Sequence, residues 1–152
     1  LERKIFLVPT LAAVEQVLLN PQAVSPASLA KAQRVAARHR ESVGLYYRAG
    51  GRIVMGADTG TLCNPHGNNA QELRYMVACG MSAKDALVGA TSLAADLLNL
   101  PDRGALVAGH IADMLIVRGD PFTQIEQVAD RRHHRLVIKA GQVVAGPESG
   151  LS

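Results

Sequence analysis

The sequence has few aromatic side chains and little net charge. Phe, Tyr and Trp together make up 3% of the chain, Trp is absent, and the formal net charge is +3. The basic residues are scattered, so the sequence shows neither a basic stripe nor an aromatic platform on which bases could stack. Nucleic acid is therefore not expected as a partner.

Cysteine and long apolar runs are also scarce. Cys63 and Cys79 form neither a disulfide framework nor a Cys-x-x-Cys metal motif. No apolar run approaches the length that spans a bilayer, so no membrane partner is expected. We expect a reduced, cytoplasmic setting. Because the chain begins with Leu1 rather than Met, we also expect a fragment whose own targeting information is missing.

What the sequence does contain is apolar residues, at 48%, which is enough for one domain with a core. Lys4–Pro9 predicts a short buried strand, and Leu11–Leu19 predicts a short helix. Ser25 then predicts the N-cap of a long helix with Pro at its first position, ended by Gly50 and Gly51. One apolar stripe runs along that helix at steps of three and four residues: Leu29, Ala32, Ala36, His39, Val43 and Tyr46 or Tyr47.

The stretch Arg52–Gly60 is the most informative one. It runs largely apolar residues into Gly56, then places the carboxylate of Asp58 and turns at Gly60. This pattern predicts a buried parallel strand that ends in a loop. In α/β folds the residues just past such strand ends form the site, so Asp58 is the first candidate. The alternative is that Asp58 only caps a turn, since Asp beside Gly is common in turns.

Three shorter helices are predicted after this strand. Asn68 or Asn69 is expected to cap the first helix, which Gly80 ends. Ser82 begins a capping box, with Asp at the position where Glu is usual, and opens the second helix. A third helix follows before Pro101, and the inward residues of the first are predicted to be Leu73, Met76 and Val77. The order strand, helix, strand, helix is typical of a parallel sheet with right-handed crossovers.

Several motifs resemble the end of an amidohydrolase barrel, most closely the imidazolonepropionase and prolidase-like (dipeptidase) branch. They cover the chain from about Ile5 to Val144, and they are Gly56-Ala-Asp-Thr-Gly60, Pro65-His-Gly-Asn68, Glu72-Leu73, Met76-Val77, Gly80-Met81, Asp85-Ala-Leu87, Ala90-Thr-Ser92, Gly104-Ala-Leu-Val-Ala-Gly109 and Ala112-Asp-Met-Leu-Ile-Val117. The two Gly-bearing segments together are fairly specific, whereas either alone would be weak.

The resemblance implies an α/β fold. Residues 1–100 would be the C-terminal strands and helices of a (β/α)8 TIM barrel, residues 101–146 the C-terminal strands of a composite β-sandwich, and residues 147–152 a tail. The residue pattern agrees after Pro101, where Gly, Val and Ile replace Ala. Ala112–Val117 and Leu136–Ile138 predict strands, and Lys139–Gln142 predicts a hairpin turn into a last strand.

The resemblance also implies roles for three polar residues. Asp58 matches the family carboxylate that binds metal and takes a proton from the metal-bound water. His66 and Asn68 match substrate-side positions. The residues themselves leave alternatives open, since His66 could be a loop histidine bonded to backbone and Asn68 a helix cap.

The other histidines are weaker candidates. His39 lies on the helix stripe and is expected to be packed, and His110, like Asp113, is expected to be structural. His133 and His134 begin a predicted strand, and because adjacent strand residues point to opposite faces they would chelate a metal poorly.

The resembled enzymes are metal-dependent hydrolases that cleave C–N bonds of amides, peptides or cyclic amides. Their divalent metal, one or two ions and most often zinc, is held by a His-x-His pair, a carboxylated Lys or Glu and two further histidines; those segments are absent here. One carboxylate cannot hold a metal that takes about four ligands. We therefore expect the C-terminal part of a hydrolase acting on a small-molecule or dipeptide-like substrate, completed by a missing N-terminal barrel segment or a companion chain.

A partial barrel would expose strand edges and apolar faces, so we expect association, either with a complementary piece or as a homo-oligomer. The competing interpretation is a non-catalytic or incomplete chain that acts as an interaction or structural partner.

Overall fold

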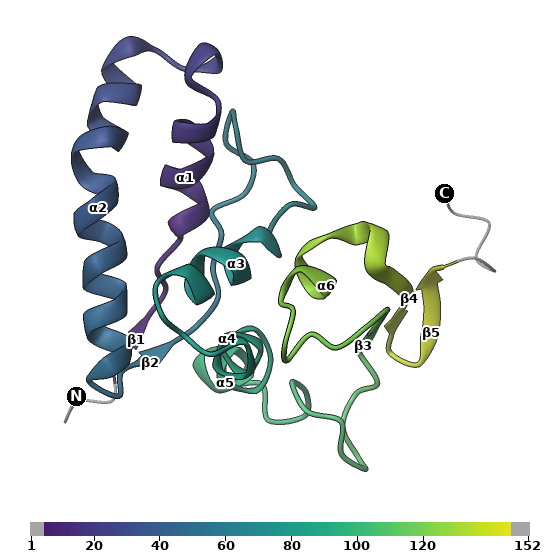
Figure 1. Ribbon diagram of the computed structural model, residues 1–152. Coiled ribbons are helices and arrows are strands. Elements are labelled where there is room, and N and C mark those ends of the chain that lie inside the picture. Colours follow the sequence, from purple (N-terminus) through teal and green to yellow (C-terminus); the bar gives the residue numbers. More distant parts are fainter. Residues whose placement is uncertain (1–4, 147–152) are drawn as a thin grey trace.

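The computed structural model describes residues 5–146, which form a mixed α/β fold (Figure 1). The elements in chain order are β1 (Phe6–Leu7), α1 (Leu11–Leu19), the 3-10 helix η1 (Pro21–Ala23), α2 (Pro26–Arg48), β2 (Arg52–Ile53), α3 (Gln71–Ala78), α4 (Ala83–Ala90), α5 (Ser92–Leu97), β3 (Met114–Val117), α6 (Glu126–Ala129), the 3-10 helix η2 (Arg131–His133), β4 (His134–Lys139) and β5 (Gln142–Ala145). The predicted tail at 147–152 lies outside the described residues.

The two strands predicted in the first part of the chain pair with each other in parallel. Phe6 lies opposite Arg52 and Leu7 opposite Ile53. Both strands are shorter than predicted, and Lys4 lies outside the described residues. Beyond Ile53 the chain continues to donate hydrogen bonds, from Val54 N to Leu7 O and from Met55 N to Gly89 O. The predicted strand is therefore buried, but its second half finds a partner in α4 rather than in a strand.

The helices α1 and α2 form a hairpin beside the parallel pair (Figure 1). The predicted cap is confirmed, since Ser25 Oγ accepts the N–H of Ser28 at 3.1 Å. The predicted stripe is also confirmed, because Ala32, Ala36 and Val43 are buried. His39 is half-buried, and its Nε2 lies 2.9 Å from the Pro9 carbonyl oxygen, which agrees with a packed histidine.

The three shorter helices lie where they were predicted, but one cap is wrong. Ser82 Oγ accepts the N–H of Asp85 at 3.0 Å, which confirms Ser82 as the cap. The reciprocal bond of a capping box is not made, because the Ser82 N–H donates to Tyr47 Oη instead. In contrast, α3 begins only at Gln71, and its N-cap residue, Ala70, makes no side-chain hydrogen bond. Neither Asn68 nor Asn69 caps it. The physical reason is that consecutive turns bring the chain into the helix, with Gln71 N bonded to Asn68 O and Glu72 N to Asn69 O, so the backbone already satisfies these donors.

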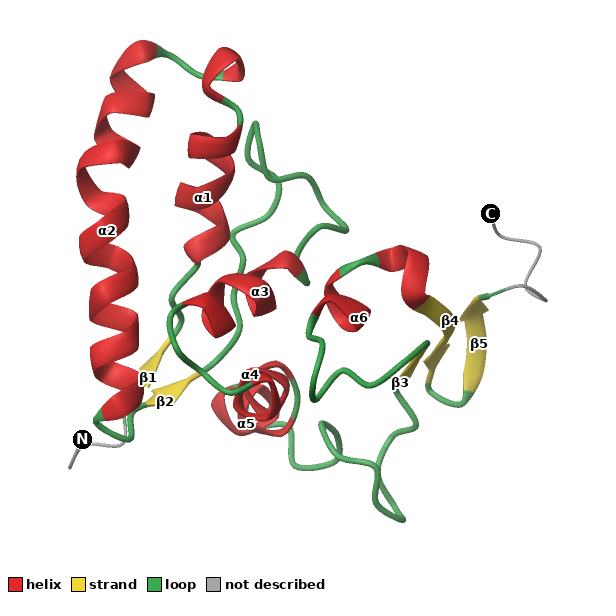
Figure 2. Cartoon of the chain, in the orientation of Figure 1, coloured by secondary structure: helices red, strands yellow, loops and turns green. Residues whose placement is uncertain are grey.

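The buried apolar side chains of the hydrophobic core come from the parallel pair and from the helices that surround it. Figure 2 shows how these elements are arranged. The predicted inward residues Leu73 and Met76 are fully buried, and Val77 packs at the edge. Ile125, just before α6, packs into the same core. Within residues 5–146, the buried cluster consists of Leu11, Val43, Ile53, Leu73, Met76, Cys79, Met81, Ala86 and Ile125.

The strands predicted after Pro101 form an antiparallel sheet in the order β3-β4-β5. The predicted hairpin turn is confirmed, with Lys139 paired to Gln142 and with positive φ at Ala140 (49°) and Gly141 (81°). Two residues with positive φ are typical of a tight hairpin turn. His134 is the first residue of β4, whereas His133 ends η2. The division at residue 100, the barrel and the sandwich stay predictions.

Candidate active site

Asp58 lies where the sequence predicts it, in the turn just beyond the buried stretch that follows β2. Its backbone is left-handed, with φ 48°, and its side chain is exposed. Positive φ is uncommon for residues other than Gly, although Asp tolerates it better than most. The turn therefore presents a solvated carboxylate at the carboxyl end of the parallel pair.

A buried amide that sequence reasoning did not single out holds this turn in place. Asn64 is 0% exposed, and its Nδ2 donates to the carbonyl oxygens of Ala57 (2.5 Å) and Asp58 (3.3 Å). Its backbone carbonyl accepts the N–H of Gly60 at 2.8 Å. The Oδ1 atom of Asn64 is buried and lacks a hydrogen-bond partner within residues 5–146. No periodic pattern points to Asn64, because its role is to bond a neighbouring loop rather than to face a core.

His66 and Asn68 occupy the same loop but differ in their contacts. The His66 ring lies against the Asp58 turn: a Cβ added to Gly60 would be 2.9 Å from His66 Nε2, and His66 Nδ1 is 3.5 Å from Thr59 Oγ1. Asn68 is half-buried, and its carbonyl accepts the N–H of Gln71. The structure thus brings His66 to the turn of Asp58 but shows no such contact for Asn68.

A second carboxylate, Glu72 on α3, lies behind the turn that follows β1. It is 0% exposed and accepts the N–H groups of Leu11 (2.8 Å) and Ala12 (2.6 Å) at the start of α1. Burial raises the pKa of Glu72 to about 7, although the two N–H donors act in the opposite direction. Glu72 is spaced four residues from Met76, so the helical pattern could have placed it on the buried face.

The described residues do not by themselves fit a metal site. Across residues 5–146 no three His, Cys, Asp or Glu side chains gather in a way that could hold an ion. The other polar candidates are engaged elsewhere: His134 Nε2 lies 2.8 Å from Val128 O, and Asp113 Oδ1 accepts the N–H of Ala140. Asp58 is the predicted ligand that the described residues place at the strand ends, and its role as a ligand stays a prediction.

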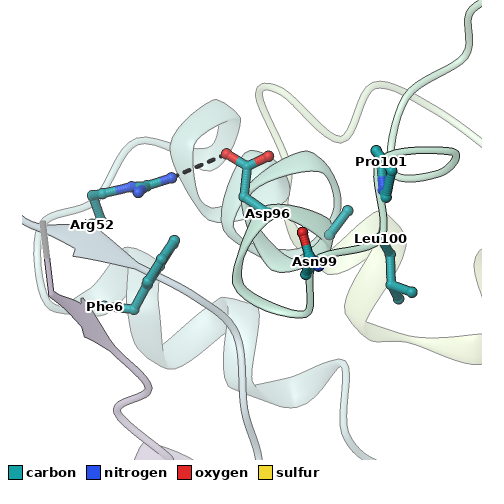
Figure 3. A pocket seen from close by; sticks show the side chains of 7 residues that line it. Phe6, Arg52, Asp96, Asn99, Leu100 and Pro101 are labelled. Atoms are coloured by element: carbon teal, nitrogen blue, oxygen red, sulfur yellow. Dashed lines mark hydrogen bonds and ion pairs between the residues drawn. The ribbon is translucent and has the colours of Figure 1, made fainter.

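A hollow lies at the other end of the parallel pair (Figure 3). It measures about 310 Å³ and is lined by the first residues of β1 and β2, Phe6 and Arg52, and by the end of α5. Arg52 is 3.0 Å from Asp96 and stacks over the Phe6 ring. Neither Asp58 nor His66 lines it, and its cation is already neutralised, so this hollow is not the candidate site.

The family model of the amidohydrolases matches residues 1–144. The chain belongs to the amidohydrolase family. This confirms the resemblance drawn from the Gly-bearing motifs. Members of the amidohydrolase family are generally metal-dependent.

The relatives of this amidohydrolase chain include enzymes of the prolidase-like branch. It is 32% identical to a Xaa-Pro dipeptidase solved with bound methionine in its active site, with a TM-score of 0.83 over 95% of this chain and 36% of that one. It is 30% identical to a prolidase solved with N-methylphosphonate-L-proline, with a TM-score of 0.84 and the same coverage.

A curated relative is the ochratoxinase of Aspergillus niger, which is 29% identical over 98% of this chain. The chain spans 31% of the length of that relative. Among residues 5–146, no helix combines the length and apolar content needed to cross a membrane.

Proposed function

We propose that this amidohydrolase chain is the C-terminal part of a metal-dependent hydrolase that cleaves an amide, peptide or cyclic amide C–N bond. The observation that carries the proposal is the exposed carboxylate of Asp58, held in a left-handed turn at the carboxyl end of a parallel pair, in a chain that belongs to the amidohydrolases. The Xaa-Pro dipeptidase and prolidase relatives favour a dipeptide-like substrate.

Asp58 would act as the proton carrier of the reaction. A carboxylate within hydrogen-bond reach of the attacking water can accept its proton and pass it to the leaving nitrogen. This chain would contribute one ligand, Asp58, to a divalent metal, which we propose to be zinc as one or two ions. When bound, that metal would lower the pKa of the attacking water.

His66 and Asn68 would line the substrate side of the site. The contact between the His66 ring and the Asp58 turn supports this for His66. For Asn68 the support is its place in the same loop, between His66 and α3.

The remaining metal ligands would come from an N-terminal barrel segment or a companion chain. The exposed apolar residues of β3 and β5 suit such an association, including a homo-oligomer. A cytoplasmic location is proposed on the two cysteines, Cys63 and Cys79, which are both free.

A second candidate function is that of a non-catalytic structural partner. One observation favours it: the described residues offer a single carboxylate at the strand ends and no group of three metal-ligating side chains.

Asp58→Asn distinguishes the two when it is made in the complete enzyme, which includes the N-terminal barrel segment or companion chain and serves throughout as the unmodified protein. The amide keeps the size of the side chain but cannot accept the proton, so kcat should fall by roughly 10² to 10⁴. Steady-state kinetics on a panel of Xaa-Pro dipeptides and N-acyl amino acids measures it. The matched control is Asp120→Asn, because Asp120 caps an exposed turn by accepting the N–H of Phe122.

Retention of more than about a tenth of the activity, a barrier change below about 1.4 kcal/mol, would make Asp58 a turn residue. Hydrolysis of no member of the panel by the unmodified protein would favour the structural partner.

A further inference from the structure

The two turns at the carboxyl ends of β1 and β2 share an unusual backbone. Thr10 follows β1 with φ 47°, and Asp58 follows β2 with φ 48°. A β-branched residue in the left-handed region is a genuine outlier, and such strain collects at functional sites. Because β1 and β2 are parallel, both outliers lie at the same end of the pair.

The segments that carry these outliers touch each other. Val54 N donates to Leu7 O at 2.9 Å, which extends the pairing beyond the strands. Further along, a Cβ placed on Gly56 would collide with the Val8 side chain and would lie 3.7 Å from Thr10 Cγ2. Thr10 therefore stands beside Gly56, two residues before Asp58.

Thr10 occupies the N-cap position of α1 without capping it. Its side chain makes no cap hydrogen bond, and the two N–H groups of Leu11 and Ala12 bind the Glu72 carboxylate instead. On the other side of the turn, His39 Nε2 lies 2.9 Å from the Pro9 carbonyl oxygen. A buried acid thus replaces the usual Thr cap, which leaves Thr10 in its left-handed backbone beside the Asp58 segment.

We propose that Glu72 is a positioning residue of the active site, which holds the Thr10 turn against the Asp58 turn so that Thr10 forms part of the substrate-contacting wall. This inference rests on the proposed hydrolase function of Asp58. Two acceptor oxygens on one buried side chain bind adjacent N–H groups, and this geometry defines the position of the turn more tightly than one bond would.

The protonation state of Glu72 offers a readout of this role. The groups that face it are Glu15 on α1, Tyr75 and Cys79 at α3, and behind them Arg40 on α2, which is paired with Glu15. When Glu72 is protonated, one oxygen carries a proton and becomes a poor acceptor for a neighbouring N–H. The hydrogen bonds from the Leu11 and Ala12 N–H groups to Glu72 should therefore weaken below about pH 7.

Glu72→Gln tests the inference, because Gln keeps the shape and one acceptor oxygen but cannot ionise. At pH 8 we expect kcat/KM to fall at least tenfold on the dipeptide that the unmodified protein hydrolyses fastest, since misplacement by about 1 Å can cost roughly 10²-fold. At pH 6 the two proteins should be nearly equal. The control is Glu41→Gln on the exposed face of α2, where Glu41 only pairs with Arg38.

A second variant separates the side chain of Thr10 from its backbone. Thr10→Gly favours positive φ, so the midpoint of thermal unfolding should stay or rise, while kcat/KM should fall at least fivefold if Thr10 contacts the substrate. Amide hydrogen exchange at Leu11 and Ala12 measures the two hydrogen bonds to Glu72 independently of enzymatic activity. We expect these two amides to lose protection from exchange in Glu72→Gln.

The outcomes are distinguishable. If Glu72→Gln lost amide protection at Leu11 and Ala12 but kept its kcat/KM, the positioning role of Glu72 would be overturned while the proposed function stood. The same would follow if kcat/KM of Glu72→Gln fell by the same factor at pH 6 and pH 8. Absence of hydrolysis by the unmodified protein would overturn the proposed function, and with it the inference that rests on it.

Discussion

The region around β1 and β2 buries its apolar side chains, whereas the sheet β3-β4-β5 leaves many of its apolar side chains exposed. The parallel pair is only two residues long in each strand, yet Ile53 is 2% exposed and Val54, the next residue, 3%. In the longer antiparallel sheet, no residue of the three described strands is buried, and Leu115 and Val143 are 40% and 49% exposed. Strand pairing satisfies the backbone, but only a layer packed on the sheet buries its side chains.

The difference between the regions predicts where stability is concentrated. Leu73→Ala removes a fully buried side chain from the core beside the parallel pair and leaves a cavity. We expect the free energy of unfolding to fall by about 2 to 5 kcal/mol. Denaturant titration measures this fall, and a loss below about 1 kcal/mol would show that the core around α3 is much looser than the structure indicates.

Glu72→Gln sharpens the comparison, because it removes an ionisable group from the packed region around β1 and β2. The folded-state pKa of Glu72, about 7, lies above its usual value of 4.5, so between these values the folded protein binds the proton more readily. This stabilisation is complete below pH 4.5 and is lost as the pH rises through 7.

Between pH 5 and pH 8 the unmodified protein should lose this stabilisation, whereas Gln does not titrate. The free energy of unfolding of the variant should therefore rise relative to that of the unmodified protein, by up to roughly 3 kcal/mol. Unfolding curves at both pH values measure the gain, and Glu41→Gln should show none. A gain in stability with a loss of activity at pH 8 would be the trade-off expected of a residue that positions a site.

Val143→Thr should have the smallest effect, and it tests the exposed sheet as Leu73→Ala tests the core. Thr keeps the branched shape, and Val143 is about half exposed on β5. We expect the free energy of unfolding to change by less than about 0.5 kcal/mol. A fall of 2 kcal/mol or more in the purified protein, read from the same titration, would reveal that another surface covers this sheet and would break the comparison.

Local patterns predicted the elements better than their ends. Ser25 and Ser82 were correctly identified as caps, because a cap depends on groups three residues away. Asn68 and Asn69 were wrongly expected to cap α3, since successive backbone turns had already satisfied its first donors. The strand at Arg52 was predicted correctly but too long. A strand ends where its partner ends, and the partner, β1, lies far away in the sequence.

The candidate site shows the same division. Asp58 follows from an apolar run, a glycine and a turn, which are all local features, and the structure places it in that turn. Asn64 and Glu72 were assigned no role in the site, because their partners are backbone groups, and those of Glu72 lie 60 and 61 residues away. No local pattern marks which backbone N–H groups a buried acid will bind.

The residue order alone specified the helices α1 to α5, the serine caps of α2 and α4, the hairpin turn after β4 and the carboxylate after β2, because these depend on periodicity and on neighbours within one turn. Tertiary structure alone decided that Glu72 is buried and binds the start of α1, and that Thr10 is strained and stands beside Gly56. The reason is that burial and strain are set by contacts between α3, the start of α1 and the segment after β2, which meet only when the chain is folded.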